Sequence, residues 1–286
     1  MIRKRQSRKA MHGITSVLTF LVIAVGVLSA TFPFYWLIIT AFKPEWSIHT
    51  YPPMFLPPSI TFEHFTGSFF GSVAFAPAME AVKDSLVVAL GNTALSLVVS
   101  LLVAFTILRY KTGGRNFSFW ILSNRFLPPI AFIIPLFLIM REVQLFDTYV
   151  GLIWVYVTFN IPFATWLLIG FIQGVPEELE DSAMIDGCSR FEAFRKVILP
   201  LLLPGLAVTV LFCFLFAWNE YMMSLLLTGR MVNTLPKVLP KYRQAHDILY
   251  GELSAAAIVA VAPAIILASM LQKYLVGGLT LGAVKY

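Results

Sequence analysis

The chain has few charged residues and almost no cysteine. Of its 286 residues, 13% are Asp, Glu, Lys or Arg, whereas soluble domains average about 25%. The two cysteines, Cys188 and Cys213, lie far apart, so they provide neither a disulfide framework nor a cysteine metal cluster. A chain with this little charge and 58% hydrophobic residues is predicted to be a membrane protein.

Sequence motifs for catalysis are also missing. The chain has no G-x-x-x-x-G-K-[ST] phosphate-binding loop, so ATP hydrolysis by that route is excluded. It has neither H-E-x-x-H nor G-x-S-x-G, which disfavours an intramembrane enzyme. We predict no cofactor or metal site in this chain. All four histidines fall outside the long apolar runs: His12, His49, His64 and His246.

Six long apolar runs account for most of the chain. A membrane-spanning helix needs about 20 apolar residues, and each run reaches that length, although Arg125 interrupts the third. The basic residues before the first run are typical of a signal peptide, but the run continues far past Ala30, so an uncleaved anchor is expected. We predict an all-α membrane protein with six transmembrane helices, at residues 13–42, 85–108, 117–140, 148–172, 201–227 and 253–275.

Lys and Arg residues predict the orientation of these helices. With six spans both termini lie on one side of the membrane, and that side receives 13 of the 21 basic residues, against seven on the other. Because basic residues concentrate in cytoplasmic loops, the tails at 1–12 and 276–286 are predicted to be cytoplasmic. Segments 43–84 and 228–251 then lie on the outer side, and we expect one interfacial helix in the first.

The third run carries an arginine at membrane depth. Arg125 lies about 12 Å along that helix, at about 1.5 Å per residue, where a charge facing lipid is costly. The side chain is expected either to face the helix bundle or to reach toward the inner headgroups. If it faces the bundle, it marks a polar site for a transported solute, with Glu220 as a candidate partner. Prolines in the third and fourth runs are typical of kinks or of a wet cavity.

Acidic residues gather in one segment. Residues 177–196 hold nine charges, including six of the fifteen acids. Pro176 and the acids after it favour a helix start, and Gly187 favours a stop. Ser189 and Glu192 have the spacing of a capping box, which predicts a second helix. That helix is expected to carry apolar side chains on one face: Phe191, Phe194 and either Val197 or Ile198.

This predicted helix–turn–helix, the acidic segment at residues 176–198, has two interpretations. It is either an amphipathic loop that rests on the membrane or a rigid contact for a soluble partner. Helices that rest on membranes are usually rich in Lys and Arg, whereas this segment has six acids and three bases. The charge therefore favours a soluble partner in the cytoplasm.

The acidic segment also contains a spaced pattern. Three residues separate Asp181-Ser182-Ala183 from Gly187, nine residues separate Gly187 from Val197, and Leu199-Pro200 closes the pattern. It resembles the Glu-Ala-Ala motif of permease subunits of binding-protein-dependent ABC importers, which ends in Ile, one residue and Leu-Pro. Ser182 in place of alanine is the main departure, and it bears on the fine packing of the contact.

The resemblance extends from about Phe32 to the C-terminus. Asp147-Thr148 with Gly151-Leu152 is similar to the family's turn between the third and fourth helices. The whole resembles the carbohydrate branch, in particular the second, six-helix permease of maltose-type transporters, and Arg125 to Pro129 is similar to polyol and glycerol relatives. Further shared stretches are Ile161-Pro162-Phe163, Trp218-Asn219-Glu220 and Gly278 to Lys285.

The resemblance implies a permease subunit in the bacterial plasma (inner) membrane that forms half of a translocation pathway. Its implied partners are a second homologous permease, two copies of a cytoplasmic ABC ATPase that binds ATP and Mg, and an extracytoplasmic solute-binding protein. ATPase motion would reach this chain through the acidic segment, acting as coupling helices. The expected coupling residues are Glu180, Asp181, Ser182, Ala183, Asp186, Gly187, Ser189, Phe191, Phe194, Leu199 and Pro200.

Candidate solute contacts combine aromatic rings, which stack on sugar faces, with polar groups that bond hydroxyls. The expected cargo is a sugar, a sugar alcohol or a glycerol-type solute. An anionic solute such as glycerol 3-phosphate is the alternative, because it would pair with Arg125. An ion-coupled secondary carrier is less favoured, since we find no internal repeat. The candidate contacts are Asn124, Arg125, Trp154, Tyr156, Asn160, Trp218, Asn219 and Glu220.

Overall fold

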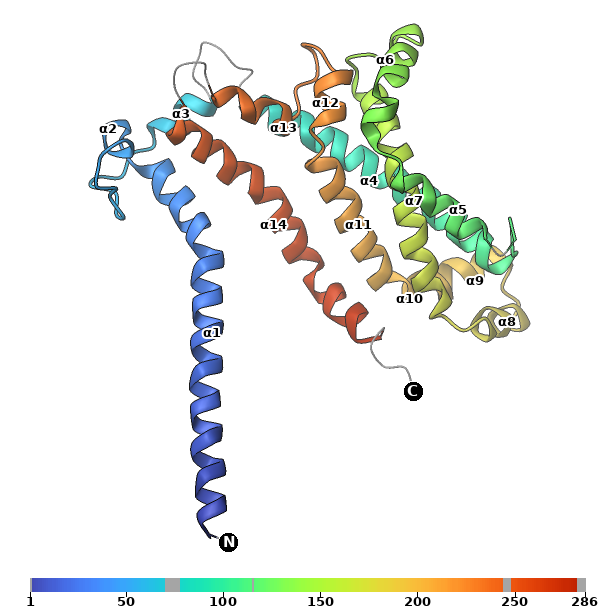
Figure 1. The fold of residues 1–286 in the computed structure, drawn as a ribbon. Helices are drawn as coiled ribbons and strands as arrows, with labels where there is room; N and C mark the ends of the chain where they lie inside the picture. The colour runs from blue at the N-terminus through green and yellow to red at the C-terminus, as the bar shows by residue number, and fades with distance from the viewer. Residues whose placement is uncertain (1, 70–77, 115, 244–247, 282–286) are drawn as a thin grey trace. The chain divides into compact units, whose positions relative to one another are not determined.

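The computed structural model describes residues 2–69, 78–114, 116–243 and 248–281. Predictions that concern His246 and the end of the C-terminal tail therefore fall outside the described residues. The chain divides into two compact units (Figure 1). The first unit comprises Met1–Gly71 and Tyr242–Val259, and the second comprises Ser72–Lys241 and Ala260–Tyr286. The described residues form helices and loops without a strand, as predicted.

The first unit contains one long helix, the start of another and two short helices. α1 runs from Ile2 to Phe42, so it begins before the predicted apolar run, and α14 (Tyr250–Leu281) starts in this unit. Two short helices, α2 (Glu45–Ile48) and α3 (Glu63–Phe69), take the place of the single interfacial helix that we expected. The Phe42 ring at the end of α1 packs against α3, because its centre lies 5.1 Å from the centre of the Phe65 ring.

The second unit is centred on three helices that pack side by side (Figure 1). These are α4 (Ala78–Arg109), α7 (Tyr149–Gln173) and α11 (Leu203–Trp218). Two of the small polar side chains buried between them donate to a neighbouring helix: the Asn92 amide to the Cys213 carbonyl at 3.2 Å, and Ser100 to the Ile161 carbonyl at 3.3 Å. Such interhelical hydrogen bonds allow polar side chains inside an apolar bundle.

Two of the six predicted spans are bent rather than continuous. In the third, α5 (Phe117–Ser123) with η1 (Asn124–Phe126) meets η2 (Pro129–Phe132) with α6 (Ile133–Glu142) at 85°. Two consecutive prolines at the break explain it, because they lack N–H donors and disfavour a helical residue before them. At the start of the fifth, the helical segment Arg190–Leu201 meets α11 at 74°. The described chain thus has four continuous candidate spans, or six if each bent pair crosses once.

Short helices make the remaining connections of the chain. The predicted fifth span, 201–227, ends early, because α11 stops at Trp218 and a separate helix begins at Met222. The short helices are α8 (Glu178–Ile185), α9 (Arg190–Ala193), the π-helical η3 (Phe194–Ile198), α10 (Leu199–Leu201), α12 (Met222–Leu227), α13 (Leu235–Val238) and η4 (Leu239–Tyr242).

One carboxylate holds the loop that follows α12. Asp147 accepts hydrogen bonds from the backbone N–H groups of Arg230, Met231 and Val232 at 2.9, 3.0 and 3.1 Å. Burial by itself raises the pKa of Asp147, but the backbone donors of this loop outweigh it and lower the pKa below its ordinary value. Thr148 then caps α7, since its hydroxyl accepts from the Gly151 N–H at 3.1 Å. These contacts explain the predicted turn at Asp147-Thr148.

Candidate functional site

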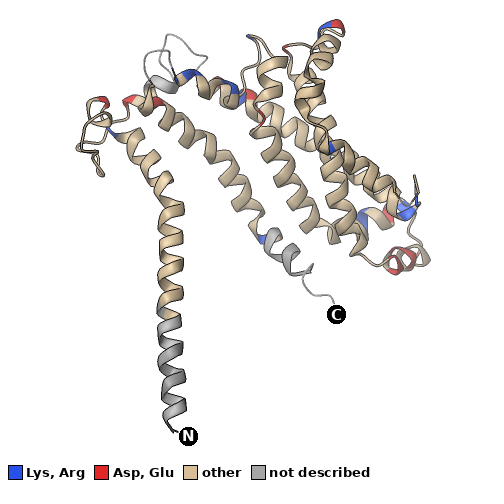
Figure 2. Cartoon of the chain, viewed as in Figure 1, with Lys and Arg blue, Asp and Glu red and all other residues tan. Residues whose placement is uncertain are grey.

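The acidic segment folds locally as predicted. α8 begins after Pro176, and its exposed acids gather there (Figure 2). Gly187 follows with φ of +89°, a left-handed conformation that favours glycine at a helix end. The predicted capping box is confirmed: the Ser189 hydroxyl accepts from the Glu192 N–H, and the Glu192 carboxylate accepts from the Ser189 N–H.

An arginine attaches α8 to the end of α4. The Arg109 guanidinium lies 3.1 Å from a Glu180 oxygen and 3.0 Å from a Glu177 oxygen, and it donates to the Val175 carbonyl at 3.2 Å. The side chains of Arg109 and Glu180 are only 9% and 11% exposed. Glu180 therefore forms part of the attachment and has little surface left for a partner.

Apolar packing fixes the second half of the acidic segment. Ile198 and Leu202 are buried in one cluster with residues of α4 and α7, and Phe194 packs against that cluster. The Phe194 ring meets the Phe105 ring edge-on at 4.8 Å. Phe194 is thus engaged within the chain, whereas Phe191 is 70% exposed, so these two rings do not share the predicted face.

The exposed surface of the acidic segment carries apolar side chains as well as acids. Ile185, the last residue of α8, is 87% exposed, and Phe191 is 70% exposed. Leu179 is 40% exposed on the first turn of α8. We call Leu179, Ile185 and Phe191 the segment tip. An exposed apolar group rimmed by charge is typical of a contact for another protein.

The remaining motif residues divide between surface and interior. Asp181 and Ser182 are exposed, and Ala183 is buried under them. The Ser182 hydroxyl donates to the Glu178 carbonyl at 2.7 Å within α8, so the polar departure from Glu-Ala-Ala is satisfied by its own helix. Asp186 is exposed at the end of α8. Leu199 and Pro200 begin α10, with Leu199 half-buried and Pro200 exposed.

A cavity of about 280 Å³ collects four of the candidate solute contacts. Its lining includes Arg125 from η1, Tyr156 and Asn160 from α7, and Glu220 beyond the end of α11. Tyr156 and Asn160 are buried, and the Tyr156 hydroxyl donates to the Glu220 carbonyl at 3.3 Å. The cavity therefore offers a guanidinium, a hydroxyl, an amide and a carboxylate on apolar walls.

Arg125 faces the helix bundle, one of its two predicted positions. Its guanidinium donates to the Phe159 carbonyl at 2.7 Å and lies 4.5 Å from the centre of the Phe216 ring. The candidate pair with Glu220 is not formed: within the described residues, no ion pair of 4.0 Å or less joins the two side chains. The Glu220 carboxylate instead accepts from the Met223 N–H at 3.0 Å, at the start of α12.

The other four candidates lie outside this cavity. Asn124 and Trp154 line a second cavity of about 380 Å³, which shares Phe159 with the first. Trp218 is 4% exposed, and its indole N–H donates to the Ala260 carbonyl at 2.9 Å, so it serves packing. The Asn219 amide donates to the Leu215 carbonyl at 2.8 Å and caps α11. Neither of these two residues lines either cavity.

The sequence analysis does not single out Arg109, Leu179 or Ile185. Nothing local shows which acid Arg109 meets, and Leu179 and Ile185 are ordinary apolar residues of the predicted helix. The exposure of Ile185 could have been predicted from its position, because an apolar residue directly before Asp186-Gly187 lies at a helix end, where it is hard to bury.

Comparison with known proteins identifies the family. Residues 96–280 match the model of the binding-protein-dependent transport system inner membrane component. The chain is 37% identical to the diacetylchitobiose uptake system permease protein DasC of Streptomyces coelicolor, over 93% of this chain and 95% of that protein. It is 32% identical to the trehalose transport system permease protein SugB of Mycobacterium tuberculosis, over 94% and 96% of the two chains.

A solved structure agrees with these relatives at the level of the fold. A chain of a bacterial ABC transporter involved in the import of the acidic polysaccharide alginate superposes with a TM-score of 0.77 and 20% identity. The match covers 92% of this chain and 96% of that one. The chain therefore belongs to the inner membrane components of binding-protein-dependent transport systems, as a multi-pass permease subunit of an ABC importer.

Proposed function

We propose that the chain forms half of the translocation pathway of an ATP-driven importer for a sugar, sugar alcohol or glycerol-type solute. It would pair with a second permease, two copies of a cytoplasmic ATPase and an external solute-binding protein. The relatives' names support a carbohydrate, since they give diacetylchitobiose and trehalose as cargo. In this proposal the acidic segment faces the cytoplasm and transmits ATPase motion to the helices.

One observation carries the coupling role: the acidic segment is fixed at its base and exposed at its tip. Arg109 and the cluster around Ile198 attach it to α4 and α7, so a push on the segment moves both helices. Ile185 and Phe191 expose apolar surface on the other side. A membrane-resting loop would not need this attachment by a largely buried ion pair.

The cavity supports a neutral solute over an anionic one. Arg125 would attract an anion, but one of its N–H groups is already bonded to the Phe159 carbonyl and its plane is stacked on Phe216. Glu220 lines the same cavity and would repel an anion. A volume of about 280 Å³ lies just below the usual range of ligand pockets, about 300–1,000 Å³, so one sugar ring or a polyol fits best.

Stimulated ATPase activity of the reconstituted importer tests the coupling role. Ile185→Ser with Phe191→Ser removes the two most exposed side chains of the segment tip and leaves the base intact. We expect at least a tenfold loss of stimulation by the solute-loaded binding protein. Met231→Ser is the matched control, because Met231 is 77% exposed in the loop after α12. Full stimulation in the tip variant would reject the proposal, as would an equal loss in the control.

A further inference from the structure

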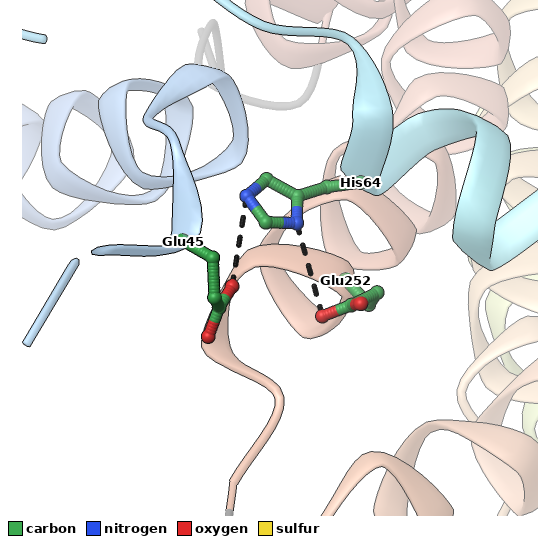
Figure 3. A group of neighbouring side chains, drawn as sticks. All are labelled: Glu45, His64 and Glu252. Atoms are coloured by element: carbon green, nitrogen blue, oxygen red, sulfur yellow. Dashed lines mark ion pairs between the residues drawn. The ribbon is translucent and has the colours of Figure 1, made fainter. Parts of the chain in front are cut away.

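A buried histidine in the first unit lies among carboxylates (Figure 3). His64 of α3 is 2% exposed, and its ring stands between Glu45 of α2 and Glu252 of α14. Its Nδ1 is 3.8 Å from a Glu252 oxygen, and its Nε2 is 3.8 Å from a Glu45 oxygen. One ligand atom from each of the three side chains lies within 4.8 Å of the other two.

The histidine is held in one tautomer. Nε2 lies 2.7 Å from the Lys43 carbonyl oxygen, which is an acceptor only, so Nε2 carries the proton and donates. In the neutral ring the lone pair is then on Nδ1, the nitrogen that faces Glu252. Metal-binding histidines are oriented in this way, with the second ring nitrogen donating to a backbone carbonyl or carboxylate.

The backbone at the start of α14 leaves room for the imidazole ring. A Cβ at Gly251 would lie 2.2 Å from Cε1, 2.3 Å from Nδ1 and 2.5 Å from Nε2 of His64. These are closer than non-bonded atoms come, so a side chain there would displace the ring. The position of Nδ1 beside Glu252 is therefore built into the packing and does not result from a loose surface side chain.

The side chain of Lys43 is directed away from this group. The Lys43 ammonium lies 4.5 Å from the centre of the Trp36 ring and donates to the Met54 carbonyl, while only its backbone carbonyl meets His64. Glu45 and Glu252 are both acidic, so a cation bound beside the ring would be attracted by both carboxylates. Glu45 and Glu252 are 48% and 25% exposed, which leaves a path for an ion.

We propose that Glu45, His64 and Glu252 form a binding site for a divalent first-row transition metal, best suited to Zn²⁺. One imidazole nitrogen and two carboxylate oxygens are a ligand set that zinc accepts. Ligands at about 2.0–2.2 Å in tetrahedral geometry lie about 3.4 Å apart, close to the observed 3.8 Å between Nδ1 and Glu252. The nitrogen ligand disfavours Mg²⁺ and Ca²⁺, which prefer all-oxygen sites.

The ion would fasten α2 and α3 to the first turn of α14. The three ligands lie far apart along the chain, and this separation explains why the sequence alone did not predict a metal site. The site does not depend on the transported solute. Its test is therefore separate from that of the proposed function.

Zinc binding by the full-length protein in detergent tests the site. The protein carries Cys188→Ser, to remove the more accessible thiol, and a tag without histidine. After treatment with EDTA, equilibrium dialysis against ZnCl₂ with elemental analysis should find one zinc per chain. Glu252→Gln and Glu45→Gln should each weaken binding at least about tenfold. Zinc should also raise the melting temperature of the protein with the unmutated site but not that of the Glu252→Gln variant.

Glu63→Gln is the matched control. A Glu63 oxygen lies 3.9 Å from His64 Nε2, yet this residue is not part of the three-residue group, and its side chain is 56% exposed. The control should keep its zinc. Absence of stoichiometric zinc from the unmutated site overturns the proposal, and so does equal binding in all variants. Tighter binding of Mg²⁺ or Ca²⁺ than of zinc overturns the choice of metal. If Glu252→Gln does not fold, Glu45→Gln on the more exposed side chain decides the outcome.

Discussion

Replacing Arg109 by glutamine tests whether the acidic segment and the end of α4 form one body. The guanidinium contacts Glu177, Glu180 and the Val175 carbonyl, and it is the ionic link between α4 and α8 among the described residues. Glutamine can keep one hydrogen bond to the carbonyl but removes the charge. Glu180 then stays largely buried without a counter-ion.

The size of the effect follows from burial. Breaking a buried ion pair by removing one partner costs about 3–5 kcal/mol. Glu177 is 69% exposed and contributes little, as exposed ion pairs usually do. Glu180 is 11% exposed, and a retained hydrogen bond places the cost at the lower end of the range. We therefore expect the free energy of local opening of α8 to fall by about 3 kcal/mol.

Hydrogen exchange measures this opening directly. The amides of Glu180 and Asp181 bond to the Glu177 carbonyl at 3.0 and 3.2 Å, in the turn that Arg109 holds. Since about 1.4 kcal/mol corresponds to a tenfold change, their exchange should accelerate about a hundredfold in Arg109→Gln. Amides in the middle of α7 should be unaffected. In the reconstituted importer, solute-stimulated ATPase activity should fall together with the protection of α8.

A double variant shows whether the pair itself is responsible. Replacing a buried ion pair by apolar side chains of similar volume is often nearly neutral. Arg109→Met with Glu180→Leu should therefore recover most of the protection that Arg109→Gln loses. Unchanged exchange in Arg109→Gln would refute the reasoning. Strict additivity of the two single effects would also refute it, because it would mean that the side chains do not interact.

Three further predictions concern single residues. Asp147→Asn should destabilise the loop after α12, because it removes the carboxylate that the loop amides bind. The folded pKa of Asp147 is lowered. The stability that its carboxylate contributes is therefore present above the unfolded pKa of about 3.9 and is lost as pH falls through the folded pKa. Thermal melts in acid should therefore converge for the two proteins, and a constant gap would contradict this. Gly187→Ala should lower the free energy of unfolding by about 1–2 kcal/mol, because a φ of +89° strains any residue with a Cβ. The space around Gly187 is open, so no steric clash adds to this cost. An unchanged melting temperature would refute the strain. Arg125→Lys keeps the charge but loses the planar stack on Phe216. The KM for transport should therefore rise severalfold in a variant that is expressed at the normal level. An unchanged KM would count against the cavity as the solute site.

Local features of the site could be predicted from the sequence. The stop at Gly187 and the box of Ser189 and Glu192 depend on residues within a few positions of each other, so spacing suffices. The long apolar runs likewise predict the candidate spans. The break in the third run was only partly foreseeable, because consecutive prolines show that a helix is interrupted but do not give the angle.

Contacts between distant segments could not be predicted. Arg109 meets acids about 70 positions later, and Asp147 holds amides more than 80 positions away. Trp218 was expected in the solute pathway, but its indole is buried and bonded to the Ala260 carbonyl. An aromatic ring at a helix end has the same sequence signal in both roles, and only the packing decides between them.

The division of the acidic segment into an anchored base and an open tip has an evolutionary consequence. Ile185 and Phe191 are so exposed that substituting them disturbs little of the chain's own packing. Arg109, Glu180 and Ile198 have no such freedom. Under the proposed coupling role, partner choice and force transmission would be encoded in separate side chains. A few changes at the tip would let one permease adopt a different ATPase, while the mechanical linkage is inherited intact.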